Sequence, residues 1–349
     1  MTSRLAKSSF DQNLLLRLDD PAGVETFLRD HGWVEPNERI ERVEKAGEGN
    51  MNLVVRVRTA RRSAVLKQSR PWVEKYPQVA APAERVGFER AFYRRVEAIP
   101  EVAERMPRVL AYEPAARALC LSDLGEAADF TTVYEGGSLR DHEIDALAGW
   151  AAALHRATRS KPDPAFANRA MRELNHQHIF ALPLTDGLPV DLNALEPGLA
   201  KAAEALRNDR PFVRRASELG RLYLQDGPCL LHGDNYPGSW LRTEHGVRVI
   251  DPEFGFFGPP EFDAAVALAH VALAGLPQAS ADRWLTAYQR VSTESLDDAL
   301  LAGFAGVEVM RRLIGLAQLP LVTRPGARQA LLERARAAVN NDSLQALWG

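Results

Sequence analysis

The strongest constraint on the fold is a change in the character of the sequence near residue 125. Before this point, short runs of β-branched and other apolar residues alternate with glycine and polar turns, which is typical of antiparallel strands. After it, most of the chain is rich in Ala, Leu, Arg and Glu, which favour helices. A chain of 349 residues is also longer than one hydrophobic core usually serves. We therefore expect an α+β protein with a strand-rich first lobe, residues 1–124, and a larger helical second lobe, residues 125–349.

The first lobe is predicted to contain a small antiparallel sheet and one strong amphipathic helix, over residues 83–97. Its strands are expected at residues 40–46, 53–58, 64–68, 109–112 and 118–121. In the second lobe, helices are expected over residues 140–160, 197–226, 261–290 and 296–340. The segment 160–195 contains scattered Pro and Gly and is expected to be a loop-rich insertion.

The overall charge and the cysteines exclude several classes of partner. The formal net charge is -3 with mixed signs, which gives no reason to expect nucleic acid or an anionic membrane as a partner. Both cysteines, Cys120 and Cys229, stand in apolar surroundings and are expected to be buried, reduced thiols. We find no signal peptide or membrane-spanning run, so a cytoplasmic protein is expected.

The first candidate for chemistry is Asp234, which follows His232 and Gly233 after an apolar run. An Asp after Gly can project from a tight turn into a cleft and accept the proton of a substrate hydroxyl. The alternative is that Asp234 caps a turn while His232 packs beneath it. A His-Gly-Asp triplet alone does not decide between the two.

The second candidate is the segment from Asp251 to Glu253, at the end of another apolar run. If the extended geometry continues, residues two apart share a face, so both carboxylates would point into the same cleft. Paired oxygen ligands suit Mg²⁺ bound to nucleotide phosphates. Asp234 lies seventeen positions earlier, and three carboxylates at one strand end would be costly without a cation. Taken alone, the pair would be better interpreted as a solvated acidic turn.

The third candidate is Lys67, at the end of a predicted strand that follows a glycine turn. A lysine in this position can reach nucleotide phosphates, and Glu89 on the next helix could pair with it. The turn over residues 47–52 could lie over the phosphates with its backbone N–H groups. Alone, each is also compatible with a surface lysine and an ordinary hairpin turn. No Walker-type phosphate loop or dinucleotide fingerprint is present.

The fourth candidate is the adjacent pair Arg311 and Arg312 in an apolar helical setting. Adjacent helix positions are about 100° apart, so one arginine could enter a cleft while the other pairs at its rim. Such an arginine could bind substrate oxygens or offset charge on a moving phosphoryl group. A helix-end ion pair is the alternative.

Together these residues resemble the aminoglycoside phosphotransferase and choline kinase superfamily, and within it the methylthioribose kinase family. The matching motifs are Gly-Asn-Met-Asn-Leu-Val at 49–54, Lys-Gln-Ser-Arg-Pro at 67–71, Gly-Ser at 238–239, Asp-Pro-Glu-Phe at 251–254, Phe-Gly-Pro at 257–259, Phe-Asp at 262–263 and Arg-Arg-Leu-Ile-Gly-Leu-Ala at 311–317. The resemblance runs from about residue 40 to about residue 335. The sequence departs from the family at residues 235–237 and 318–320, near the expected substrate pocket.

This resemblance implies a protein-kinase-like two-lobed fold, with ATP and Mg²⁺ as cofactors and a homodimer as the assembly. By it, Asp234 is the catalytic base and a substrate contact, Arg311 and Arg312 contact the substrate, and Asp251, Glu253 and Ser239 hold the metal. The nucleotide is expected to be bound by Gly49, Asn50, Asn52, Lys67, Glu89, Ser122, Asp123 and Leu124.

The resemblance implies transfer of the γ-phosphoryl group of ATP to a hydroxyl of 5-methylthioribose or a related deoxypentose. One alternative keeps this chemistry and changes the substrate to an aminoglycoside or another amino-alcohol, which the two arginines would repel. Another alternative is a catalytically silent pseudokinase that only binds nucleotide. Lys67, Asp234, Asp251 and Glu253 are all present, which disfavours it.

Overall fold

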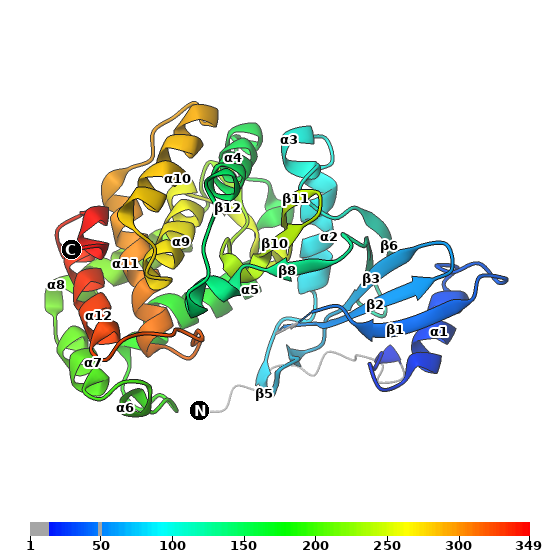
Figure 1. Ribbon diagram of the computed structural model, residues 1–349, viewed down its shortest axis with the longest axis horizontal. Coiled ribbons are helices and arrows are strands. Elements are labelled where there is room, and N and C mark those ends of the chain that lie inside the picture. The colour runs from blue at the N-terminus through cyan, green and yellow to red at the C-terminus, as the bar shows by residue number, and fades with distance from the viewer. Residues whose placement is uncertain (1–13, 48–50) are drawn as a thin grey trace. The chain divides into compact units, whose positions relative to one another are not determined.

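The structure is a computed structural model that describes residues 14–47 and 51–349. The chain divides into two compact units (Figure 1). The first contains the described residues up to Ala98 together with Met106–Gly125, and the second contains Ile99–Arg105 and Glu126–Gly349. An antiparallel sheet dominates the first unit and helices dominate the second, so the predicted α+β fold class is confirmed.

A five-stranded antiparallel sheet forms the centre of the first unit, in the order β1-β2-β3-β7-β6. Its strands are β1 (Ile40–Lys45), β2 (Leu53–Thr59), β3 (Ser63–Gln68), β6 (Val109–Glu113) and β7 (Ala118–Ser122). Each begins and ends within one residue of its predicted bounds. A second hairpin, β4 (Trp72–Val73) and β5 (Tyr76–Ala80), escaped prediction because such short strands show no clear alternation.

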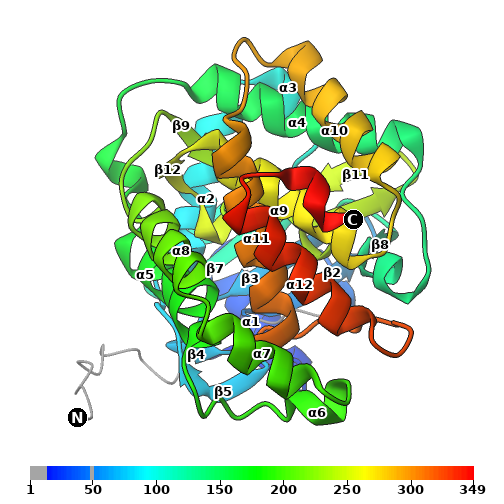
Figure 2. The same cartoon turned by 90° about the vertical axis from the view of Figure 1, so that its left-hand side faces the viewer.

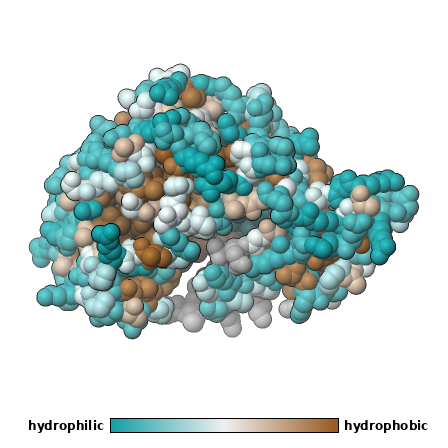
Figure 3. Space-filling view, in the orientation of Figure 1, coloured by the Kyte–Doolittle hydropathy of each residue, from teal (hydrophilic) through white to brown (hydrophobic). Residues whose placement is uncertain are grey.

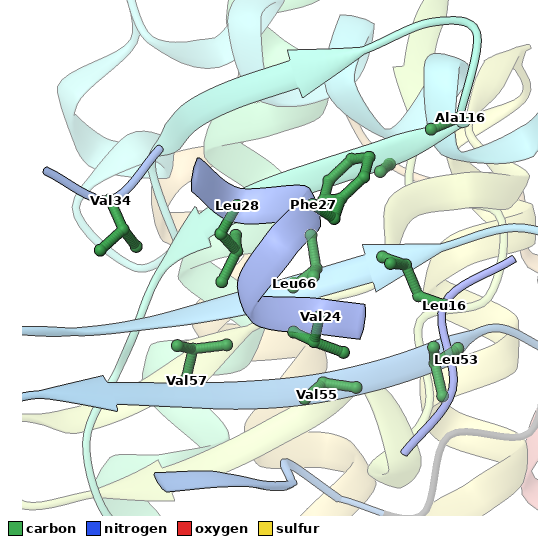
Figure 4. Close-up of a cluster of buried hydrophobic side chains, with 11 residues drawn as sticks. Leu16, Val24, Phe27, Leu28, Val34, Leu53, Val55, Val57, Leu66 and Ala116 are labelled. Atoms are coloured by element: carbon green, nitrogen blue, oxygen red, sulfur yellow. The ribbon is translucent and has the colours of Figure 1, made fainter. Parts of the chain in front are cut away.

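Helix α1 (Pro21–Asp30) covers one face of this sheet (Figure 4). It begins where the side chain of Asp20 accepts a hydrogen bond from the backbone N–H of Gly23, a normal N-cap. Its apolar residues Val24, Phe27 and Leu28 recur at helical spacing and pack on the sheet. The sheet residues beneath them are Leu53, Val55, Val57 and Leu66. Since side chains alternate along a strand, Lys67 points to the opposite face of β3 from Leu66.

The second unit contains most of the helices. They are α3 (Pro100–Ala103), α4 (Asp141–Thr158), α5 (Arg169–His176), α6 (Leu192–Leu195), α7 (Leu199–Arg207), α8 (Arg210–Tyr223), α9 (Pro260–Leu273), α10 (Gln278–Val291), α11 (Asp298–Ile314) and α12 (Ala327–Asn340). Helix α9 is buried along its whole length, and α11 packs against both α9 and α12 (Figure 2). A helix buried on all sides has no polar stripe, which explains its continuous apolar sequence.

Two small antiparallel sheets in this unit carry the loops with the acidic motifs. Strands β11 (Gly246–Val249), β10 (Trp240–Thr243) and β8 (Ala127–Asp129) form one, and β12 (Phe256–Gly258) and β9 (Cys229–Leu231) form the other. The loop from β9 to β10 contains Asp234, and the loop from β11 to β12 contains Asp251. Trp240 pairs with Val249, so the start of β10 lies beside the end of β11.

Several predicted boundaries are wrong. The stretches 197–226, 261–290 and 296–340, predicted to be mostly helix, each contain two helices, and residues 315–326 between α11 and α12 are not helical. The segment 160–195 contains helix α5 and a π-helical turn, η4 (Gln177–Ala181), rather than mainly loop. Residues Ile99–Arg105 belong to the second unit, because α3 packs on α4 and the carbonyl of Arg105 accepts from the backbone N–H of Val249 at 2.8 Å.

The surface and the cysteines agree with the bulk composition. On the face shown in Figure 3, hydrophilic residues predominate and the hydrophobic patches are small and separate. Cys120 and Cys229 are buried free thiols, as predicted, and burial raises the pKa of Cys120 to about 11. Within residues 14–47 and 51–349, no helix has the length and apolar character needed to cross a membrane.

Candidate active site

In the first unit, a buried ion pair joins Lys67 on β3 to Glu89 on α2 (Arg85–Val96). The Nζ atom of Lys67 lies 2.7 Å from Oε2 and 2.8 Å from Oε1 of Glu89. Tyr93, one turn further along α2, donates a hydrogen bond to the same carboxylate at 3.1 Å. The side chains of Lys67 and Glu89 are 3% and 0% exposed, so this is the pair expected from the sequence and it is fully inside the protein.

Other residues of this unit that were predicted to bind the nucleotide contact neighbouring side chains or backbone groups. Asn52 is buried, and its Oδ1 accepts a hydrogen bond from Nε of Arg85 at 2.8 Å. Asp123 forms an ion pair with Arg56 at 2.9 Å, and Ser122 accepts from the backbone N–H of Arg108 at 2.8 Å. These contacts hold the end of β7 in place. Leu124 follows and is partly buried. Gly49 and Asn50 lie outside the described residues.

In the second unit, a tight turn after β9 presents Asp234. Gly233 has φ of 83°, a left-handed conformation that favours glycine, and a Cβ there would stand 2.2 Å from the carbonyl oxygen of Phe254. His232 is buried beneath the turn, and its Nε2 donates to the carbonyl of Ile250 at 2.9 Å. The sequence could not decide whether His232 packs beneath the turn. The structure shows that it does.

The buried carboxylate of Asp263, on α9, holds this turn rigidly. Its oxygens accept hydrogen bonds from the backbone N–H groups of His232 at 2.6 Å and Gly233 at 2.9 Å. His155 on α4 approaches the same carboxylate at 3.3 Å. Burial opposes the charge on Asp263, but the contact with His155 and the backbone donors lower its pKa. Asp263 therefore stays charged and fixes the loop that precedes Asp234.

Two arginines from α11 converge on a single oxygen of Asp234. Nη2 of Arg311 lies 3.5 Å and Nη2 of Arg312 lies 3.6 Å from Oδ1. Both arginines are buried, at 5% and 6% exposure, whereas the side chain of Asp234 is 22% exposed. Helical spacing alone allowed one arginine to enter the cleft while the other pairs at its rim, but the two long side chains both reach the same carboxylate.

The environment of Asp234 adjusts its basicity. Burial raises the pKa of this carboxyl, while Arg311 and then Arg312 lower it by stabilising the charged form. The net direction is upward. A carboxylate with a raised pKa is a better proton acceptor than an ordinary aspartate, which is the property a general base requires.

The metal motif has a different geometry from the one assumed. Asp251 has φ of 64° and lies in the left-handed region, and Pro252–Phe254 form a 3₁₀ turn, η7. The prediction that the backbone stays extended from Asp251 to Glu253 is therefore wrong. Asp251 is partly exposed and Glu253 is buried. Asn168 fixes this turn by donating to the carbonyls of Glu253 at 2.9 Å and Gly255 at 3.0 Å.

The three carboxylates are not gathered as the sequence argument expected. Across the described ranges, no group of three or more His, Cys, Asp or Glu side chains is arranged to hold a metal ion. The positively charged groups next to Asp234 are instead the guanidinium groups of Arg311 and Arg312. Ser239 lies next to Asp251, since the carbonyl of Ser239 accepts from the backbone N–H of Ile250 at 2.9 Å.

Several residues of the site were missed. Glu308 forms ion pairs of 2.8 Å with Nε of both Arg311 and Arg312. Its spacing of three and four residues from them on one helix was a usable signal in the sequence. Asn175 accepts a hydrogen bond from Nη1 of Arg311 at 3.0 Å, and His270 contacts Glu308 at 3.1 Å. No sequence pattern indicates these two contacts, since each joins residues more than thirty positions apart.

The fold and the site define the class of protein: a small-molecule phosphotransferase built on the protein-kinase-like fold. A solved structure with the same fold is that of a microcompartment-associated aminopropanol kinase. The TM-score is 0.57, with 18% sequence identity, and the alignment covers 93% of this chain and 99% of that one.

The chain belongs to the phosphotransferase enzyme family, whose family model matches residues 42–303. It is similar to the methylthioribose kinase of Exiguobacterium sibiricum, with 29% identity over 343 residues, 85% of each chain. It is also similar to the methylthioribose kinase of Bacillus pumilus, with 32% identity over 183 residues, 44% of this chain and 45% of that one. These findings confirm the family resemblance and make the chain an ATP-dependent kinase of small molecules.

Proposed function

We propose that this kinase transfers the γ-phosphoryl group of ATP to a hydroxyl of a small sugar, 5-methylthioribose or a related deoxypentose. The convergence of Arg311 and Arg312 on Oδ1 of Asp234 carries the proposal. Both contacts are 3.5 Å or longer and the side chain is 22% exposed, so this carboxylate can receive a proton. The names of the sugar kinases to which the chain is similar support the choice of substrate.

In the proposed reaction, the substrate hydroxyl oxygen forms a bond to the γ-phosphorus of ATP. The bond between this phosphorus and the bridging oxygen of the β-phosphate breaks, and ADP leaves. The proton of the hydroxyl moves to the carboxylate of Asp234. The role proposed for Lys67, held by Glu89, is to bind the phosphates of ATP.

Asp251, Glu253 and Ser239 are the residues proposed to hold Mg²⁺. The donors are all oxygen atoms, which fits a hard cation. Mg²⁺ on nucleotides typically uses one or two carboxylates, with phosphates and water completing the shell, so a pair of carboxylates is sufficient. When bound, the ion would neutralise charge on the phosphates. A cytoplasmic location and a homodimer remain part of this proposal.

A coupled assay of ADP release tests the proposal directly. The enzyme is incubated with ATP–Mg²⁺ and, separately, methylthioribose, 5-deoxyribose, kanamycin or choline. We expect the highest kcat/KM with one of the two pentoses. A preference for kanamycin or choline would refute the substrate proposal, and no turnover despite a thermal shift with ATP–Mg²⁺ would favour the pseudokinase alternative.

A further inference from the structure

Arg311 and Arg312 contact a series of buried, hydrogen-bonded polar side chains that has no assigned role. Glu308 is 1% exposed and lies between the two guanidinium groups. Nε of Arg312 donates to Oε1 of Glu308 at 2.8 Å, and Nε of Arg311 lies 2.8 Å from Oε2. One carboxylate thus contacts both arginines through separate oxygens.

The next members of this chain fix the orientation of Glu308. His270 is buried, and its Nε2 lies 3.1 Å from Oε1 of Glu308, while its Nδ1 lies 2.5 Å from the hydroxyl of Tyr134. A carboxylate only accepts hydrogen bonds, so Nε2 carries the proton and Nδ1 accepts from Tyr134. Burial lowers the pKa of His270 to about 4, so the imidazole is neutral near pH 7.

The charges in this cluster sum to zero. Arg311 and Arg312 contribute two positive charges, and Glu308 and Asp234 contribute two negative charges, since 2 − 2 = 0. Burial opposes the charge on Glu308, but Arg311 and Arg312 lower its pKa far below the ordinary value. Other titratable side chains around the pair are neutral as well: burial lowers the pKa of His178 and raises the pKa values of Tyr134, Tyr223 and Tyr236.

We propose that Glu308 sets the charge of the substrate pocket: together with Asp234 it neutralises the arginine pair, so the pocket selects an uncharged sugar. This inference rests on the proposed function of the same site. Moving an ionised group from water into such a neutral, buried pocket costs free energy that no opposite charge offsets. Without Glu308, the pocket would carry one uncompensated positive charge, and it would then favour an anionic substrate.

The test uses three pentoses that differ only at carbon 5: 5-deoxyribose, 5-amino-5-deoxyribose and ribose 5-phosphate. For the wild-type enzyme we expect the highest kcat/KM with the neutral sugar. In Glu308→Gln, kcat/KM for 5-deoxyribose should fall by about 100-fold, as expected when catalytic groups are misplaced. The ratio of kcat/KM for ribose 5-phosphate to that for 5-deoxyribose should rise by about tenfold or more, because one positive charge is released.

Three further variants keep the test decisive. Glu196→Gln is the matched control, because Glu196 is a buried glutamate of the same unit that caps α12: it accepts from the backbone N–H groups of Arg328 and Gln329 and from the side-chain amide of Gln329. It should leave the charge preference unchanged. Glu308→Asp keeps the charge and should also keep the preference. If Glu308→Gln does not fold, Arg312→Gln tests the opposite change of charge. It removes one positive charge and should shift the preference toward the cationic 5-amino-5-deoxyribose.

The two proposals fail in different ways. If the wild type prefers kanamycin or choline to every pentose, the proposed function is wrong. If the wild type phosphorylates 5-deoxyribose but Glu308→Gln and Arg312→Gln keep the wild-type ratios of kcat/KM among the three pentoses, the role given to Glu308 is wrong while the kinase function stands.

Discussion

The two units of this kinase hold buried positive charge in different ways. In the first, Lys67 pairs with Glu89, and both side chains are closed off from solvent. In the second, Arg311 and Arg312 share two carboxylates, and one of these, Asp234, is 22% exposed and contacted only at 3.5 and 3.6 Å. The close contacts to Glu308 hold the arginines, and the looser ones to Asp234 leave that carboxylate able to react. We propose that the closed pair in the first unit positions Lys67, whereas the longer contacts in the second unit leave Asp234 able to accept a proton.

The largest effect, a loss of activity, is expected at Asp234, the carboxylate with the longer contacts to the arginines. Replacing Asp234 with Asn should lower kcat by roughly 10²–10⁴-fold, because the proton acceptor is lost while its shape is kept. Binding of ATP–Mg²⁺, measured by thermal shift, should be largely preserved. A variant that retained more than a tenth of the activity would show that Asp234 is not the base.

A large effect on stability is expected at the closed pair. Glu89→Gln removes the buried carboxylate that the ammonium of Lys67 contacts at 2.7 Å, so the free energy of unfolding should fall by roughly 3–5 kcal/mol. Urea denaturation measures it. Glu84→Gln is the control in the same region, since Glu84 is 65% exposed and pairs with Arg117. If both variants lost the same stability, burial of the Lys67–Glu89 pair would not explain the loss.

A smaller effect should appear as the pH is lowered. The pKa of His270 is about 4 in the folded protein, below its ordinary value of 6.5, so the unfolded chain binds the proton first. Stability is then lost as the pH falls from about 6.5 toward 4, by up to about 3 kcal/mol from this group. Thermal melts of the wild type and of His270→Gln across this range should converge at the acid end. Parallel curves would show that His270 is not responsible.

The same pH range should also affect turnover. Because burial raises the pKa of Asp234, its protonation should reduce kcat at a higher pH than expected for an ordinary aspartate. A pH profile of kcat measured with saturating substrates checks this. A profile whose acid limb lies at or below the ordinary aspartate range would contradict the direction of the shift.

The smallest effect is expected at the surface of the first unit. Arg94 and Glu97 form an ion pair of 3.1 Å with side chains 49% and 42% exposed. Glu97→Ala should change the free energy of unfolding by no more than about 0.5 kcal/mol, because solvent screens such pairs. Loss of stability similar to that of Glu89→Gln would remove the contrast between closed and exposed pairs.

Much of the local structure could be predicted from the sequence. The strands at β2 and β3 follow from alternating β-branched residues, and the His232–Asp234 turn follows from a glycine between a buried strand and a polar loop. The Lys67–Glu89 pair could be anticipated because the positions of both elements were clear. Helix ends were predicted poorly, although the turn between α9 and α10 contains Gly275 and Pro277, two poor helix formers that were a usable signal.

The sequence by itself determined the family and the two kinds of lobe, because these depend on local patterns and short motifs. It also singled out Asp234, whose role as the base is our proposal. Only the tertiary structure decided which charges meet. It turned Asp251 into a left-handed conformation, brought both arginines to Asp234 and placed His270 and Asn175 beside them. The reason is physical: buried charges must find partners across the fold, and those partners come from helices whose positions are fixed by packing and not by spacing along the chain.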